Sequence, residues 1–188
     1  RSMMKANPSP MSVADYCEAM AANRIVVNHD YQREEGIWGA FARSYFIESV
    51  ILGYPIPKIF LYTRFDLNAR RSIKEIVDGQ QRSHALLMFY KNRMVLSSKI
   101  HNIDLTGKKY QNLSDDQKQD FLSYSLSIDE FSGVSEEEIR ESFSRMNTNN
   151  ISLNAEELLN AKYQGEFKQF ILSLSRLYRE LLIKAGVI

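Results

Sequence analysis

The apolar positions of this 188-residue chain follow different periods in its earlier and later parts. Short runs rich in β-branched and aromatic residues, which are typical of strands, occur within residues 24–128. Toward the C-terminus, apolar residues recur every three or four positions, as they do in helices with one buried face. Strands crowded into the earlier part and helices into the later part indicate an α+β fold, rather than regularly alternating strands and helices.

Strands are expected at 24–27, 59–65, 72–77 and 124–128, and the second and third of these should form a hairpin. Helices are expected at about 12–23, 40–52, 83–90, 114–122 and 135–146, followed by a long helical stripe at 167–181. Short polar side chains that can cap a helix stand at the start of several of these: Ser12, Ser114, Ser135 and Asn154. Residues 97–111 are polar with little periodicity and should form a loop or weak strands.

The length of the chain suits one domain, or one domain with an appendage. We expect residues 1–11 to be a tag remnant and a flexible N-terminus, because Arg1-Ser2 precede Met3. Residues 12–132 should form the core, and residues 133–188 a helical C-terminal extension of the same domain. The extension ends abruptly after a long amphipathic stretch, which indicates a truncated fragment of a longer protein.

Composition narrows the class of protein. The chain has 24 Lys and Arg against 23 Asp and Glu, so no global basic field indicates nucleic acid. Cys17, its single cysteine, excludes an internal disulfide framework, suits the reducing cytoplasm, and is expected to be a buried structural thiol. No apolar run reaches transmembrane length, and the histidines show no zinc-binding spacing. A P-loop sequence is also absent.

The most informative segment is Asp78-Gly79-Gln80-Gln81-Arg82, which lies between a strand-like run and a helix-like run. A helix N-terminus presents free backbone N–H groups and a dipole that favours negative charge. Glycine allows a ligand to approach the backbone closely. Arg82 lies one turn into the helix and could bind phosphate oxygens through its fork of N–H groups. This arrangement favours an anion site.

The same residues have a purely structural interpretation. Asp78 and Gln81 stand at the spacing of a capping box, in which case the motif only starts a helix and Arg82 is a solvated charge. The carboxylate of Asp78 would also repel a phosphate. Asp78 must therefore belong to the cap, pair with Arg82, or bind a metal ion or a sugar hydroxyl. The spacing alone leaves these alternatives open.

Two further clusters are candidates. Tyr31-Gln32-Arg33 and Trp38 lie in a segment with weak secondary structure, where Arg33 could hold phosphate and Gln32 could bind a base edge or ribose. The alternative, which we favour for Trp38, is that the indole anchors this segment to the core. Arg145 and Asn147 stand at the end of a predicted helix. Arg145 has an ordinary role as a cation at a helix C-terminus, and Asn147 an ordinary role as a residue that ends the helix.

Five elements occur in one order along the chain. They are Tyr31-Gln32-Arg33 with Trp38, the run 47–57, the run 77–82, the run 143–148 and the run 153–158. That order resembles the N-terminal domain family of the GmrSD modification-dependent restriction enzymes, over about residues 12–174. The Asp-Gly-Gln-Gln-Arg element is the most specific part of the resemblance.

The resemblance implies a ParB/sulfiredoxin-like fold, with a small mixed sheet, flanking helices and a helical C-terminal part. It implies a domain that binds and hydrolyses nucleoside triphosphate, with Mg²⁺, as a switch in antiphage defence. Its nucleotide-binding residues would be Asp78, Gly79, Gln80, Gln81 and Arg82, with Gln32, Arg33 and Asn147 in addition; Asp78 and Arg82 would be catalytic. Family members often stand beside an HNH nuclease domain, which this chain does not contain, so no nuclease activity is assigned to it.

The chain departs from the family pattern in two places. Trp38 stands five residues after Arg33, where family members usually have four. The loop therefore carries one extra residue, and its side chains are expected to point in a different direction. The usual Leu-Thr after the motif is replaced by Ser83-His84, so the start of the helix differs chemically.

Three functional hypotheses follow. The first is a nucleotide-dependent regulatory domain whose output is a missing C-terminal effector domain. The second is a ParB-like DNA-binding module without nucleotide turnover, in which Arg70-Arg71 and Lys108-Lys109 would contact the phosphate backbone. The third is an interaction scaffold, which predicts a homodimer or a hetero-complex and no binding of nucleotide or DNA.

Overall fold

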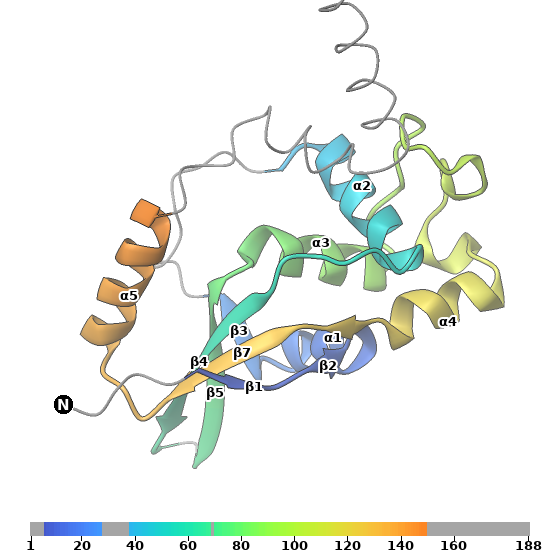
Figure 1. Cartoon of the computed structure of the whole chain (residues 1–188). Coiled ribbons are helices and arrows are strands. Elements are labelled where there is room, and N and C mark those ends of the chain that lie inside the picture. Colours follow the sequence, from blue (N-terminus) through green and yellow to red (C-terminus); the bar gives the residue numbers. More distant parts are fainter. Residues whose placement is uncertain (1–5, 28–37, 69, 150–188) are drawn as a thin grey trace, which may run out of the picture. The chain divides into compact units, whose positions relative to one another are not determined.

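The computed structural model describes residues 6–27, 38–68 and 70–149, and its side chains as far as residue 142. The chain divides into two compact units, residues 1–140 and 141–188. The second unit lies mostly outside the described residues, and so do the helix start predicted at Asn154 and the stripe at 167–181. The first unit contains a mixed sheet and several helices, which confirms the α+β prediction (Figure 1).

A mixed sheet forms the centre of the first unit. Its strands, in spatial order, are β1 (Ala6–Pro8), β7 (Ile128–Ser132), β4 (Ile59–Asp66), β5 (Arg71–Asp78) and β3 (Ile25–Val27). The β4–β5 hairpin is antiparallel, as the sequence predicted, while β7 and β3 run parallel to their hairpin neighbours. Two short strands, β2 (Met11–Ser12) and β6 (Ser125–Leu126), pair separately.

The predicted helices are present. They are α1 (Val13–Ala21), α2 (Ala40–Ile51), α3 (Gln80–Tyr90), α4 (Asp115–Ser123) and α5 (Glu136–Asn149). Three of the predicted caps are confirmed: Ser12 accepts from the backbone N–H of Asp15, and Ser114 and Ser135 both take part in capping boxes. Residues 97–111 form a loop that includes short 3-10 turns at Ile103–Leu105 and Tyr110–Asn112.

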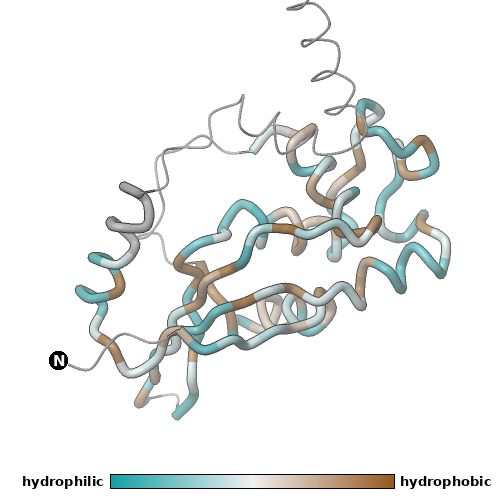
Figure 2. The backbone as a smooth tube through the Cα atoms, in the orientation of Figure 1, coloured by the Kyte–Doolittle hydropathy of each residue, from teal (hydrophilic) through white to brown (hydrophobic). Residues whose placement is uncertain are grey.

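The main core lies between one face of the sheet and helices α1 to α4. Alternate residues of the strands, such as Leu61, Ile76 and Ile128, are buried in this core, as strand geometry requires. Hydrophobic and hydrophilic positions accordingly alternate along the backbone of the strands and helices (Figure 2). Cys17 is completely buried in this core, which confirms that it is a structural thiol, and burial raises its pKa to about 12.

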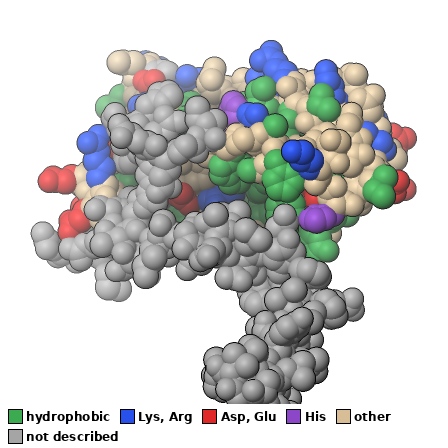
Figure 3. Space-filling view, turned by 90° about the horizontal axis from the view of Figure 1, so that it is seen from above, with side chains coloured by type: hydrophobic (Ala, Val, Ile, Leu, Met, Phe, Trp, Pro, Cys, Tyr) green, Lys and Arg blue, Asp and Glu red, His purple; other side chains and the backbone are tan. Residues whose placement is uncertain are grey.

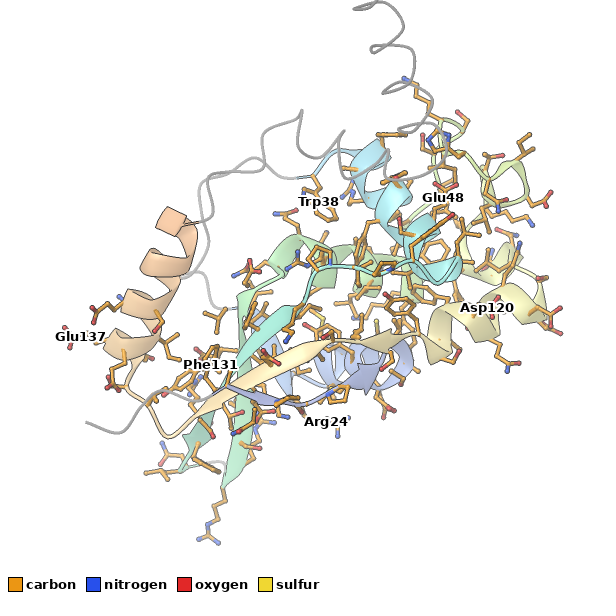
Figure 4. The ribbon with its side chains drawn as sticks, viewed as in Figure 1. Arg24, Trp38, Glu48, Asp120, Phe131 and Glu137 are labelled. Atoms are coloured by element: carbon orange, nitrogen blue, oxygen red, sulfur yellow. The ribbon has the colours of Figure 1, made fainter. Side chains whose placement is uncertain are left out.

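Buried polar side chains of α2 hold the loop that follows α3. The hydroxyl of Ser44 accepts from the backbone N–H of Ser97, and the carboxylate of Glu48 accepts from the backbone N–H of Asn102 (Figure 4). Each bond satisfies a partly buried backbone donor. Helix α2 therefore fixes this loop through hydrogen bonds as well as apolar packing.

The N-terminal segment differs from the sequence prediction of a flexible end. Residues 6–8 form strand β1 along the free edge of β7, and residues 11–12 form β2. The backbone N–H of Ser9 also donates to the carbonyl of Ile128 at 2.8 Å. These contacts involve backbone groups, which no side-chain pattern reports, and an exposed strand edge recruits such a segment readily.

Candidate functional site

The motif singled out in the sequence forms the turn between β5 and α3. Asp78 is the last residue of β5, and Gly79 is the N-cap of α3 with φ +104° and ψ 20°. No side chain caps this helix start. The capping-box interpretation of Asp78 and Gln81 is therefore wrong, because the cap position belongs to a residue without a side chain. The backbone N–H groups of the first turn lack a side-chain acceptor among the described residues.

Gly79 is required by the turn itself. Its positive φ is strained for any other residue, and a Cβ there would lie 3.1 Å from Ile59 Cγ1 and 3.3 Å from Arg82 Nη2. The glycine was expected to let a ligand approach the backbone closely. Two side chains of the protein instead fill the space beside its Cα.

Arg82 is a structural cation. One of its terminal nitrogens, Nη2, donates to the carboxylate of Asp78 at 2.9 Å and to the carbonyl of Lys58 at 3.0 Å. The Arg82 side chain is only 14% exposed, whereas that of Asp78 is 49% exposed. Of the alternatives for Asp78, pairing with Arg82 is confirmed, and Arg82 is not a solvated charge. The guanidinium ties the start of β4 to the turn that precedes α3.

The Nε atom of Arg82 is buried and has no hydrogen-bond partner among the described residues. A buried guanidinium N–H without an acceptor is costly, since its hydration has been lost without compensation. Arg82 therefore has unused capacity to donate, beside the uncapped start of α3.

Both glutamines of the motif support the turn. Gln80 Nε2 donates to the carbonyls of Ile76 and Val77, the residues before Asp78 in β5. The side-chain oxygen of Gln81 accepts from the backbone N–H of Trp38 at 3.2 Å, which connects the turn to the segment that leads into α2. The Trp38 ring packs edge-on against Phe46 at 5.5 Å, which confirms that this indole anchors its segment to the core (Figure 4).

A pair of buried hydroxyl groups, from Ser83 and Tyr16, supports the turn from the side of the core. The hydroxyl of Ser83 donates to the carbonyl of Gly79 at 2.8 Å, and the hydroxyl of Tyr16 lies 2.7 Å from Ser83 Oγ. Because Ser83 has a single hydroxyl proton, Tyr16 must be the donor in the second bond. Both side chains are fully buried, and burial raises the pKa of Tyr16.

A comparison with protein-family models matches residues 16–164 to the N-terminal domain of the GmrSD restriction endonuclease. The chain belongs to this family. The match contains the β5–α3 turn and most of the described structure, so the predicted resemblance is confirmed. No curated protein and no solved structure gives a significant match. As a GmrSD N-terminal domain, the chain is part of a restriction protein.

Ser83 of this GmrSD N-terminal domain is a buried hydroxyl on α3, and Tyr16 supplies the partner that such a hydroxyl needs. Neither residue was identified as part of the site from the sequence. The signal available was a serine at an apolar position of α3, and its partner lies 67 residues away along the chain.

The Tyr16–Ser83 pair predicts a specific pattern of stabilities. Ser83→Ala should reduce the free energy of unfolding by about 1–3 kcal/mol, because it leaves the Tyr16 hydroxyl buried without a partner. Adding Tyr16→Phe to Ser83→Ala should restore part of this loss. Urea unfolding of both single variants and of the double variant measures the coupling. Strictly additive losses would show that the hydroxyls do not depend on each other.

The described structure does not test the other predicted site residues of this GmrSD N-terminal domain. Gln32 and Arg33 lie outside the described residues. Asn147 lies in the last turn of α5, and its side chain is not described. No group of three or more His, Cys, Asp or Glu side chains suitable for a metal ion occurs among the described residues.

A cavity of about 510 Å³ lies away from the motif, beside α1 and the β3–β5 edge of the sheet. It is lined by Met11, Asp15, Glu18, Ala19, Arg24, Ile25, Ser72 and Lys74. Its charged groups include both signs, and Lys74 is already paired with Glu130 at 2.7 Å. This surface contains no motif residue.

Among the described residues, no helix is long and apolar enough to cross a membrane.

Proposed function

We propose that this domain binds the phosphates of a nucleoside triphosphate at the N-terminus of α3 and regulates a restriction protein through that ligand. The observation that supports the proposal is the uncapped first turn after Gly79. Backbone N–H groups that lack a side-chain acceptor point toward the space before the helix, where the helix dipole favours an anion. The Arg82 guanidinium beside them adds a full positive charge.

Arg82 acts here through its charge. Asp78 and the Lys58 carbonyl hold Nη2, so the guanidinium is already oriented before a ligand arrives. Preorganised donors stabilise charge on a phosphoryl group without the cost of reordering a flexible side chain. These contacts support a role for Arg82 in phosphate binding, and in charge stabilisation during phosphoryl transfer, in addition to its structural role in the turn.

Asp78 is the candidate for contact with a metal ion. Its half-exposed carboxylate would repel a bare triphosphate, but it suits a Mg²⁺ ion that takes most of its other ligands from phosphate and water. No second or third acidic side chain completes a protein metal site in the described part of the chain. Bound Mg²⁺ would neutralise phosphate charge during hydrolysis.

The hydrogen bond between Gln81 and Trp38 could couple ligand binding at the turn to the segment that leads into α2. A phosphate on the first turn of α3 would act on Gln81, whose side chain accepts from the backbone of Trp38. Trp38 in turn packs on Phe46 of α2. If the bound nucleotide favours one position of Trp38, the fraction of molecules with Trp38 in that position will rise. An effector domain that contacts this region could respond to the change.

Thermal unfolding of the chain with ATP, GTP, CTP or UTP, each with and without Mg²⁺, tests this function. A ligand that binds only the folded state must raise the melting temperature, by RT ln(1 + [L]/Kd) in free energy. We expect stabilisation by at least one triphosphate, and a larger effect with Mg²⁺. An unchanged melting temperature with every triphosphate at millimolar concentration would contradict the proposal. Tripolyphosphate serves as a control that separates phosphate binding from base recognition.

A further inference from the structure

The β4–β5 hairpin extends beyond the rest of the sheet. Strand β7 pairs with β4 only as far as Thr63, and β3 pairs with β5 only from Lys74. Beyond these points the rungs Arg64–Ile73, Phe65–Ser72 and Asp66–Arg71 pair β4 with β5, without a third strand among the described residues. Residues 64–68 and 70–73 therefore form a two-stranded ribbon that leaves the body of the sheet (Figure 1). We refer to them as the hairpin ribbon.

The end of the hairpin ribbon carries apolar side chains in solvent. Phe65 is 72% exposed and Leu67 is 85% exposed. Neither residue contributes to the core, so folding does not account for their presence. Large apolar side chains that protrude together indicate a contact surface.

The hairpin ribbon is also locally basic, in a chain with a net charge of only +1. It contains Arg64, Arg70 and Arg71 against the single acid Asp66. Arg64 is paired with Glu75 of β5. Arg70 and Arg71 are exposed, and neither has an ion-pair partner in the described part of the chain. On the face seen in Figure 3, by contrast, cationic side chains are scattered among neutral and apolar ones.

We propose that the hairpin ribbon binds duplex DNA, with Arg70 and Arg71 on backbone phosphates and Phe65 and Leu67 against the groove. The major groove admits a two-stranded β-ribbon, and arginine is well suited to phosphate. Apolar side chains can contact thymine methyl groups there. Two exposed arginines on a two-stranded ribbon match a groove that is lined by phosphates. The shape and charge of the ribbon thus favour DNA over a protein partner.

This inference does not depend on the nucleotide site. The hairpin ribbon and Gly79 lie at opposite ends of β5, which is eight residues long. At about 3.3 Å per residue, they are separated by roughly 23 Å. Variants at one end can therefore be made without touching the other, and failure of one proposal leaves the other to be judged separately.

Fluorescence anisotropy with a labelled mixed-sequence DNA duplex, over a series of salt concentrations, tests the proposal. We expect Arg70→Ala with Arg71→Ala to weaken binding about tenfold or more at low salt. The slope of log affinity against log salt should become shallower by about 2, since each phosphate contact contributes about 0.9. Phe65→Ser with Leu67→Ser should weaken binding with little change in slope, because these contacts release no counterions.

The matched control is Lys91→Ala with Arg93→Ala, which removes two exposed cations at the far end of α3. This variant should bind like the wild-type chain. Melting temperatures of all variants establish that each is folded. The proposal is overturned if the wild-type chain does not bind duplex at low salt, or if the arginine variant binds equally well. It is also overturned if the control loses as much affinity as the arginine variant. A changed mass in light scattering with unchanged DNA binding would identify the hairpin ribbon as a protein contact instead.

Discussion

Replacing Arg82 with alanine should weaken the binding of nucleoside triphosphate roughly 10- to 150-fold. The estimate is the roughly 1.5–3 kcal/mol scale of a charged hydrogen bond, converted at about 1.4 kcal/mol for each factor of ten. Two effects act together, since the variant loses a cation and also leaves the Asp78 carboxylate without its partner. An unpaired carboxylate at the helix start would itself repel phosphate. Calorimetry with Mg²⁺ and the triphosphate that gives the largest thermal shift measures the loss.

The interpretation of the Arg82 variant requires controls, because this side chain also holds the turn together. Arg82→Lys retains the charge but not the planar fork, and should bind with intermediate affinity. Arg24→Ala removes another arginine, whose nearest carboxylate oxygen on Glu18 is 3.9 Å away at the surface, and should change nothing. If folded Arg82→Ala protein retains wild-type affinity, Arg82 has no part in the nucleotide site.

Gly79→Ala should be among the most destabilising single substitutions in the domain. An alanine at φ +104° is strained, which costs about 1–3 kcal/mol, and its Cβ would press on Ile59 at 3.1 Å. Ile59 is fully buried, so it cannot move aside cheaply. The clash also displaces the Arg82 guanidinium, and triphosphate binding should weaken as well. Urea unfolding gives the loss of stability directly.

Gly53→Ala provides the matched control for this experiment. Gly53 also has a positive φ, of +73°, but nothing lies within 4 Å of the position its Cβ would take. Its substitution therefore isolates the cost of backbone strain. A loss of stability as large as that of Gly79→Ala would show that packing against Ile59 and Arg82 contributes nothing.

The residues of the turn between β5 and α3 show why the sequence could locate this turn but could not predict how its side chains are arranged. Asp78 and Gln81 had the spacing of a capping box, yet the N-cap proved to be Gly79. The spacing could not reveal this, because the position of a cap depends on where the strand ends. Strand β5 continues to Asp78 through its pairing with Phe60 of β4, a partner separated by a whole hairpin.

The roles of the motif side chains were likewise set by distant partners. Arg82 is held by the carbonyl of Lys58, Gln81 by the backbone of Trp38, and Ser83 by Tyr16. None of these partners has a sequence spacing that local patterns can report. The ion pair of Arg82 with Asp78, four residues apart in the chain, was within reach of sequence reasoning, and it was among the alternatives considered.

The sequence alone determined the class of fold, most helix starts and the hairpin, because periodicity, short polar caps and turn residues act within a few positions along the chain. Its ordered motifs also determined the family, as the match over residues 16–164 confirms. Only the tertiary structure decided the pairing of residues 6–8 with β7, the cap at Gly79 and the exposed end of the hairpin. Each of these depends on contacts between segments far apart in the chain, whose energies no local pattern contains.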